Sequence, residues 1–318
     1  MPAKGASRSR SSVRGAKRRA PVRPSFAGAL HRGKEQARIV LEARRRRAAR
    51  RRAEGILFPA GKSAGLLLAE GDSWFDYPFH DILEELEQRF NYTTESVAHR
   101  GDRVEEMVYD EGPLDRLASR IEKLARAERR PKAILLSGGG NDIAGDALTV
   151  LLNHSRSGLP PLSEQVVAGL IQERLRVAII SLAAAATELC RQSFAGAPTI
   201  PILIHGYDYP VPDGRGYLGG LWMFPGPWLE PGFRRKGYLD LAERCRVMES
   251  LIDRFNVVLS EIAGSPGLEH VRHLDLRGTL SNALKGRGYR AWWNDELHPT
   301  ARGFVAVARR FDEVLRSL

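Results

Sequence analysis

Short apolar runs alternate with longer amphipathic stretches from Gly55 to the end of the chain. Runs of about six mostly apolar residues are typical of buried strands. Such runs predict strands at 65–70, 132–137 and 200–205, and two less apolar segments, at 93–98 and 271–276, bring the expected number of strands to five. Stretches with apolar residues about 3.6 positions apart indicate helices. They predict helices at 79–90, 114–129, 163–193, 235–262 and 299–315.

This alternation of strands and helices determines the expected fold class. Successive strands joined by helices pair in parallel, and right-handed crossovers place helices on both faces of the sheet. We therefore predict a three-layer α/β/α sandwich around a mainly parallel sheet of about five strands. The pattern does not determine the order of the strands in that sheet.

Charge is unevenly distributed along the 318 residues. The net charge of the whole chain is +11, but residues 1–55 contain 18 Lys and Arg against 3 Glu, a net charge of +15. Residues 56–318 therefore have a net charge of −4 and lack the basic surface of a nucleic-acid-binding domain. We expect two parts, a basic extension at 1–55 and a globular domain at 56–318.

The extension is the most basic part of the chain. Residues 1–32 are rich in Ser, Arg, Ala and Pro, a composition that favours disorder, whereas 34–54 could form a frayed helix. Seven arginines lie within residues 44–52. They could contact nucleic acid or an anionic membrane, or form a solubilising tail, and the Ser-rich, acid-poor composition is also typical of organellar transit peptides.

Several classes of protein are disfavoured by composition. No apolar run approaches the roughly 20 residues that a transmembrane helix needs. The first thirty residues contain no apolar core of a secretory signal peptide. Cys190 and Cys245 are too few for a disulfide scaffold or a zinc ribbon. We expect a cytoplasmic protein without a transmembrane segment.

Polar residues follow the predicted strands. In a parallel sheet, ligands bind beyond the carboxyl ends of the strands, so these residues should meet at one edge. The polar groups, four after strands and one before the last helix, are Gly71–Phe75, His99–Asp102, Gly138–Asp142, His205–Tyr209 and Asp295–Pro299. Together they bring Ser, Gly, Asn, Asp and His to one place, which is the chemistry of acyl transfer.

Four of these segments resemble the marker blocks of the SGNH (GDSL) hydrolase superfamily. The matching segments are GDS at Gly71–Ser73, Gly101, GGND at Gly139–Asp142 and DELHP at Asp295–Pro299. They occur in the family's order over about residues 65–315. The resemblance implies a flavodoxin-like α/β/α fold and ester hydrolysis without metal or cofactor. The first block reads GDSWFDYP instead of the usual GDSL, so the substrate is not implied.

The resemblance and the residues together suggest individual roles. Ser73 would be the nucleophile, and Asp295 would orient His298, the general base, across a three-residue spacing. The oxyanion hole would combine the backbone N–H groups of Ser73 and Gly101 with the side-chain amide of Asn141. The simpler alternatives are a helix-capping Ser73, and a capping Asp295 followed by a surface His298.

Two other enzyme classes fit the motifs less well. A two-metal phosphoesterase could use Asp72, Asp76 and Asp142, but the sequence contains no D-x-H or H-x-H pair. We expect Asp72 and Asp142 to brace their loops instead. The nucleophile motif of an α/β-hydrolase, G-x-S-x-G, is not matched, because Phe75 stands where the second glycine would be.

An aromatic segment at 205–238, rich in Gly and Pro, suggests where the substrate lies. We expect no regular structure there, and either a loop that lines the site or a satellite hydrophobic cluster. The candidate substrate-lining residues are Trp74, Tyr207, Tyr209, Trp222 and Trp293. The substrate would be a small-molecule, lipid or carbohydrate ester. The alternative function is a non-catalytic binding module that the arginine-rich extension directs to nucleic acid or an anionic membrane.

Overall fold

A parallel five-stranded sheet forms the centre of the fold. The structure, a computed structural model, describes residues 63–217 and 225–318. The strands are β1 (Gly65–Glu70), β2 (Tyr92–Ser96), β3 (Ala133–Leu136), β4 (Ile202–His205) and β5 (Val271–Leu274). Every neighbouring pair is parallel, and the order is β2-β1-β3-β4-β5. The predicted strand positions and the flavodoxin-like sheet are confirmed.

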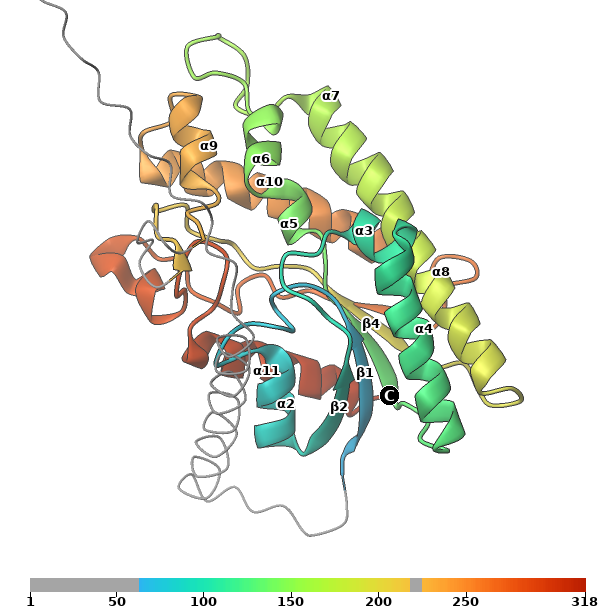
Figure 1. Ribbon diagram of the computed structural model, residues 1–318. Coiled ribbons are helices and arrows are strands. Elements are labelled where there is room, and N and C mark those ends of the chain that lie inside the picture. The colour runs from blue at the N-terminus through green and yellow to red at the C-terminus, as the bar shows by residue number, and fades with distance from the viewer. Residues whose placement is uncertain (1–62, 218–224) are drawn as a thin grey trace, which may run out of the picture. The chain divides into compact units, whose positions relative to one another are not determined.

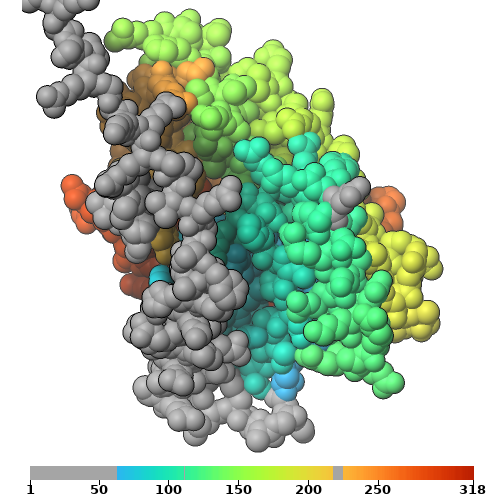
Figure 2. All heavy atoms as spheres, in the orientation of Figure 1, coloured from blue at the N-terminus to red at the C-terminus, as the bar shows by residue number. Residues whose placement is uncertain are grey.

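Helices cover both faces of this sheet (Figure 1). The helices that follow β1 and β5 along the chain pack against each other on one face: α2 (Ile82–Phe90) and α11 (Ala301–Leu315). The other face carries α3 (Val104–Tyr109), α4 (Glu111–Arg126), α8 (Arg176–Ser193) and α10 (Leu241–Ile262). Figure 2 shows the side chains of α4 and α8 in continuous contact on the surface in view. The predicted three layers are therefore present.

Short helices occupy the connections at the carboxyl edge of the sheet. They are α5 (Gly140–Ile143), α6 (Asp146–Leu151), α7 (Glu164–Val167), the π-helical η1 (Ala168–Leu175), α9 (Glu230–Arg235) and the kinked 3₁₀ segment η3 (Lys285–Ala291). The sequence analysis did not predict α3, α5, α6 or η3. Such segments are too short to show an apolar repeat.

Three predicted helices differ from the observed ones for local reasons. The helix predicted at 79–90 begins only at Ile82, because Phe79 has a positive φ of 75° and Asp81 caps the first turn. The stretch at 163–193 is helical throughout but contains the π segment η1. The helix predicted at 235–262 is divided by Gly237, whose φ is 80°, and a new helix starts at the Asp240 cap.

The remaining predictions concern the aromatic segment 205–238, the basic extension and membrane-spanning helices. The expectation that 205–238 lacks regular structure is wrong at α9, which Leu229 and Pro231 initiate. The basic extension 1–55, its frayed helix and Trp222 lie outside the described residues. In the part of the chain that the structure describes, no helix has both the length and the hydropathy to cross a bilayer.

The strand order also fixes where a ligand can bind. The chain runs from β1 outward to β2 and then returns to the other side of β1 at β3. Helices leave β1 and β3 toward opposite faces, so a crevice opens between their carboxyl ends. The GDS block follows β1 and the GGND block follows β3, which places both at this crevice.

Candidate active site

The turn after β1 holds Ser73 at the opening of the crevice. A Cβ atom on Gly71 would lie 2.6 Å from the Cβ of Ser137, so only glycine lets the ends of β1 and β3 come this close. Asp72 braces the turn, because its Oδ1 accepts hydrogen bonds from the Trp74 N–H at 3.0 Å and the Ser137 hydroxyl at 2.7 Å. The alternative of a helix-capping Ser73 is wrong, since Asp81 caps α2.

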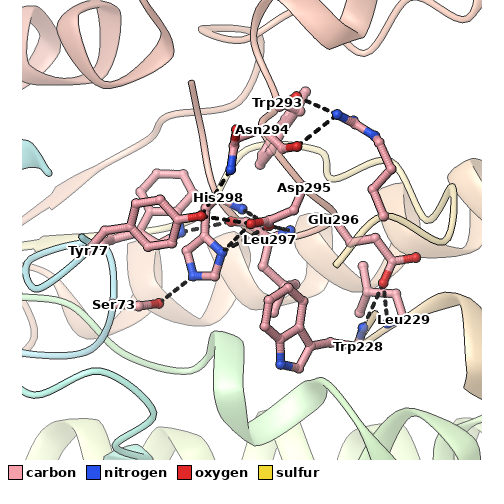
Figure 3. A network of polar contacts seen from close by, with 12 residues as sticks. Ser73, Tyr77, Trp228, Leu229, Trp293, Asn294, Asp295, Glu296, Leu297 and His298 are labelled. Atoms are coloured by element: carbon pink, nitrogen blue, oxygen red, sulfur yellow. Dashed lines mark hydrogen bonds and ion pairs between the residues drawn. The ribbon is translucent and has the colours of Figure 1, made fainter. Parts of the chain in front are cut away.

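Ser73, His298 and Asp295 form a connected chain of hydrogen bonds (Figure 3). The Ser73 Oγ lies 2.8 Å from His298 Nε2. His298 Nδ1 lies 2.9 Å from Asp295 Oδ1 and 3.1 Å from Oδ2. His298 is only 5% exposed and Asp295 is fully buried, and Thr300 caps α11. The alternative of a capping Asp295 and a surface His298 is therefore wrong.

Asp295 is held as a carboxylate despite its burial. Burial opposes its charge, but the hydrogen bond and charge of His298, the Leu297 N–H at 2.9 Å and the Tyr77 hydroxyl at 2.8 Å outweigh burial. The pKa of Asp295 consequently lies below its ordinary value. An ionised, fixed carboxylate keeps the proton of the imidazole on Nδ1 and leaves Nε2 free to accept the Ser73 proton.

Tyr77 is a site residue that the sequence analysis missed. Its ring stacks on the His298 imidazole, with 4.2 Å between centroids and 21° between planes. Its hydroxyl donates to Asp295 Oδ2 and accepts from Asn294 Nδ2 at 3.1 Å. The indole N–H of Trp74 donates to the Leu297 carbonyl at 3.1 Å. The added residues of the GDSWFDYP block therefore hold the DELHP turn, and the length of that block was the available signal.

Ser73, Gly101 and Asn141, the three residues predicted to form the oxyanion hole, border the same cleft as His298. Asn141 comes from α5, and its Nδ2 donates one hydrogen to the Asp102 carbonyl at 3.0 Å. An amide carries two hydrogens, so the second remains for a ligand. Within the described chain, no group accepts a hydrogen bond from the backbone N–H of Ser73 or of Gly101.

The Gly101 turn is tied to the GDS turn. The His99 N–H donates to the Gly71 carbonyl at 2.9 Å, and the Arg100 N–H donates to Asp76 Oδ2 at 3.1 Å. Gly101 has a φ of 91°, a conformation that glycine adopts without strain, and a side chain there would meet open space. The three predicted oxyanion-hole residues are therefore on neighbouring turns at the same crevice.

Two cavities adjoin Ser73. The larger is an open cleft of about 370 Å³. Its walls include Tyr77, Arg100, Tyr217, Trp228 and His298. The smaller is a pocket of about 40 Å³ whose apolar walls include Ile143, Ala144, Leu229, Met248 and Ile252.

The predicted substrate-lining residues have different positions. Trp74, Tyr207 and Trp293 are buried and border the small pocket, not the open cleft. Tyr209 borders neither cavity, and its hydroxyl donates to Asp253 Oδ1 at 2.7 Å. The aromatic walls of the cleft are instead formed by Tyr77, Tyr217 and Trp228. The last two belong to the aromatic segment that the sequence singled out.

Glu296, the second missed residue, anchors that segment next to the catalytic turn. Its carboxylate accepts four backbone N–H groups, from Gly214, Trp228, Leu229 and Glu230, at 2.7–3.0 Å. Burial raises the pKa of Glu296 to about 7, although the hydrogen bonds from these four donors lower it. The anchored loop brings the Trp228 ring edge-on to His298, with 5.4 Å between centroids.

The aspartates considered as metal ligands have other partners. Asp72 braces the GDS turn, Asp76 accepts from Arg100, and Asp142 Oδ2 accepts from the Val104 N–H at 3.2 Å. The loop-bracing roles predicted for Asp72 and Asp142 are confirmed. Burial raises the pKa of Asp142 to about 6. Across residues 63–217 and 225–318, no three His, Cys, Asp or Glu side chains gather as a metal site would require.

Comparison with known proteins finds similar structures but no similar sequences. No protein-family model and no curated protein matches the sequence. The lipase Lip_vut3 from a goat rumen metagenome is 15% identical with a TM-score of 0.46, over 78% of this chain and 96% of that chain. Axe2, an acetylxylan esterase from Geobacillus stearothermophilus, is 14% identical with a TM-score of 0.41, over 80% and 94%.

A third similar structure comes from Parabacteroides merdae and is described as a GDSL-like lipase. It is 15% identical with a TM-score of 0.43, over 80% of this chain and 97% of that chain. At such identities, and with TM-scores below 0.5, the activity of this chain has to be argued from its own site.

Proposed function

We propose that this protein is an SGNH (GDSL)-type serine hydrolase that cleaves carboxylic esters. The observation that carries the proposal is the unbroken hydrogen-bonded chain from Ser73 Oγ through His298 to Asp295. The four marker blocks, which lie together at the crevice between β1 and β3, support it. A binding module would not need a nucleophile, a base and an orienting carboxylate in this arrangement.

The proposed reaction begins when Ser73 Oγ attacks the ester carbonyl and its proton passes to His298 Nε2. Asp295 stabilises the resulting imidazolium. The negative charge that develops on the carbonyl oxygen is stabilised by the N–H groups of Ser73 and Gly101 and by the amide of Asn141. His298 then donates its proton to the leaving alcohol, and water releases the acid from Ser73 by the same steps.

A fluorophosphonate probe tests the proposal directly, because it reacts covalently with an activated serine. The wild-type protein should be labelled at Ser73, and Ser73→Ala should not be labelled. His298→Ala should be labelled far more slowly. Chelation with EDTA should leave ester turnover unchanged. Equal labelling of the wild type and Ser73→Ala would refute the assignment of the nucleophile.

A further inference from the structure

The two cavities beside Ser73 have three wall residues in common. Ser73, Asn141 and Leu297 border both the open cleft and the small pocket. The nucleophile therefore lies where the two spaces meet. An ester bound with its carbonyl carbon at Ser73 Oγ would extend its acyl group into one space and its alcohol into the other.

The chemistry of the leaving group determines which part enters which space. The leaving alcohol oxygen must receive its proton from His298 Nε2, so it has to lie next to His298. His298 borders the cleft of about 370 Å³ and is not among the residues that border the small pocket. The alcohol is thereby assigned to the large cleft, and the acyl group to the pocket of about 40 Å³.

The size of the small pocket limits the acyl group. An engineered apolar cavity of about 150 Å³ holds a benzene molecule, so a pocket of about 40 Å³ holds a group of only a few heavy atoms. Its walls belong to the packed core, since Ile143, Ala144, Leu229, Met248 and Ile252 are all buried. A close-packed core does not expand easily for a longer chain.

The polarity of the small pocket points to an apolar acyl group. Two carboxylates border the pocket, and both already have partners. Asp72 accepts from Trp74 and Ser137, and Asp208 accepts from the backbone N–H groups of Gly278 and Leu280 at 2.9 and 2.5 Å. These bonds hold both carboxylates to the protein, whereas the remaining walls are mainly aliphatic and aromatic.

The large cleft is lined mainly by aromatic side chains. Its aromatic rings are anchored: Tyr217 meets Tyr77 edge-on at 5.8 Å, and Trp228 meets His298 edge-on at 5.4 Å. Arg100, an exposed side chain whose Nε pairs with Asp76 at 3.2 Å, adds a polar edge to the same cleft. Fixed aromatic walls with polar edges favour an alcohol that contains either a hydroxyl-bearing ring or an aryl ring.

We propose that the enzyme hydrolyses esters of acetyl-sized acyl groups with bulky, ring-bearing alcohols. This inference rests on the proposed serine-hydrolase function. In the reaction the Ser73 Oγ–acyl bond forms and the bond from the acyl carbon to the alcohol oxygen breaks. The Ser73 proton leaves with the alcohol by way of His298, and water then converts the short acyl-enzyme to the free acid.

A chain-length series measures the limit on the acyl group. The value of kcat/KM for 4-nitrophenyl acetate, propionate, butyrate and hexanoate should fall steeply, by about tenfold or more for each methylene group beyond the capacity of the pocket. A maximum at hexanoate together with fluorophosphonate labelling of Ser73 would overturn this inference and leave the proposed function standing. Absence of both labelling and turnover would overturn the two together.

Variants of α10 test whether the small pocket sets that limit. Met248→Ala should raise kcat/KM for butyrate relative to acetate by about tenfold. Ile252→Val removes one methyl group, perturbs the core less and should move the ratio in the same direction by a smaller factor. Leu251→Ala, a buried residue on the same helix that does not border the pocket, is the matched control and should leave the ratio unchanged. An unchanged ratio in folded Met248→Ala and Ile252→Val would refute the assignment of the pocket.

The alcohol side is tested with acetates of different alcohols. Phenyl acetate and an acetylated monosaccharide should both have lower KM values than methyl acetate. The acetate with the lower KM of these two shows whether the cleft prefers an aryl ring or a hydroxyl-bearing ring. Trp228→Ala should raise KM for that ring-bearing acetate about tenfold more than it raises KM for methyl acetate. Equal KM values for all three acetates would refute the ring preference.

Discussion

Tyr77 lies flat on the His298 imidazole, 4.2 Å between ring centroids, while its hydroxyl donates to Asp295 Oδ2 at 2.8 Å. One side chain therefore contacts two of the three residues of the proposed catalytic chain. Asn294 donates in turn to the Tyr77 hydroxyl at 3.1 Å. The phenol hydroxyl supplies one of the hydrogen bonds that stabilise the buried carboxylate, and the ring restricts how the imidazole can turn.

Replacing Tyr77 separates these two effects. Tyr77→Phe keeps the stacked ring and removes the donor, so Asp295 attracts the imidazolium proton more strongly. The acid limb of the pH profile of kcat/KM should move to higher pH, and kcat should fall by roughly tenfold. Tyr77→Leu removes the ring as well and should lower kcat further.

Tyr109→Phe is the matched control for Tyr77, because Tyr109 is an exposed tyrosine of α3. It should change neither the pH profile nor kcat. If Tyr77→Phe left the acid limb where it is in the wild type, the hydrogen bond to Asp295 would have no part in setting the protonation of His298.

Asn141 provides a test of the oxyanion hole. Asn141→Ala removes the side-chain amide that would donate to the carbonyl oxygen of the ester. That oxygen becomes negatively charged only as the transition state forms, so kcat should fall by about 10²–10³-fold with little change in KM. Asn153→Ala is the control, because that amide also donates to a backbone carbonyl, Pro160, but borders neither cavity. A change in KM alone would mean that Asn141 binds the ground state and not the oxyanion.

Parts of this site could be predicted from the sequence and parts could not. The Asp295–His298 contact spans three residues, so spacing alone indicated it. The contact of Tyr77 with Asp295 joins positions 218 apart, and that of Glu296 with Gly214 joins positions 82 apart. Both depend on how two loops approach across the crevice, which apolar periodicity does not encode.

The fold, too, was predictable from the sequence only in part. The central strands β1, β3 and β4 were predictable because each is a mainly apolar run, whereas the order of the five strands depends on how the crossovers pack. The helix predicted at 235–262 was wrong between α9 and α10 because Gly237 and Asp240, a stop signal and a start signal, lie within an otherwise helical pattern.

Glu296 lies outside the proposed catalytic chain, but we expect it to stabilise both the fold and the wall of the cleft. In Glu296→Gln an NH2 group, which cannot accept, replaces one carboxylate oxygen, so two of the four backbone N–H groups lose their partner. The free energy of unfolding should fall by about 2 kcal/mol or more at pH 8. KM for ring-bearing acetates should rise as the Trp228 loop loosens.

Glu261→Gln is the comparison for Glu296, because Glu261 is an exposed carboxylate paired with Arg176. Its stability should change by less than about 0.5 kcal/mol. Urea unfolding measures both variants. A Glu296→Gln protein as stable as the wild type would show that the backbone hydrogen bonds lost in this variant do not hold the loop.

The buried Glu70 at the end of β1 predicts a pH-dependent stability. Burial raises its pKa to about 8, although its Oε1 accepts the Gly71 N–H at 3.0 Å. The folded protein thus keeps a proton that the unfolded chain releases near pH 4.5, and stability is lost as pH rises from about 4.5 to 8. Glu70→Gln stays neutral and escapes this loss.

Unfolding in urea at pH 5 and pH 8.5 measures the effect of Glu70. The advantage of Glu70→Gln over the wild type should grow between these pH values by up to about 4 kcal/mol. Other titrating groups, such as Asp142, contribute equally to both proteins and cancel in the difference. A difference that stays constant with pH would mean that Glu70 is ionised in the folded protein throughout.

The arginines at 44–52 give the basic extension a prediction of its own. Replacing all seven with Gln in the full chain lowers the net charge from +11 to +4. Turnover of 4-nitrophenyl acetate should not change, because that substrate needs only the groups at the crevice.

If the extension binds polyanions, the wild type should bind a mixed-sequence RNA or phosphatidylserine vesicles with an affinity that falls steeply between 50 and 300 mM salt. Each phosphate contact contributes about −0.7 to −0.9 to the slope of log K against log salt. The substituted protein should lose most of that slope. Binding that withstands high salt, or that persists when all 18 Lys and Arg of residues 1–55 are replaced with Gln, would place the partner surface on residues 56–318 and contradict the division of charge along the chain.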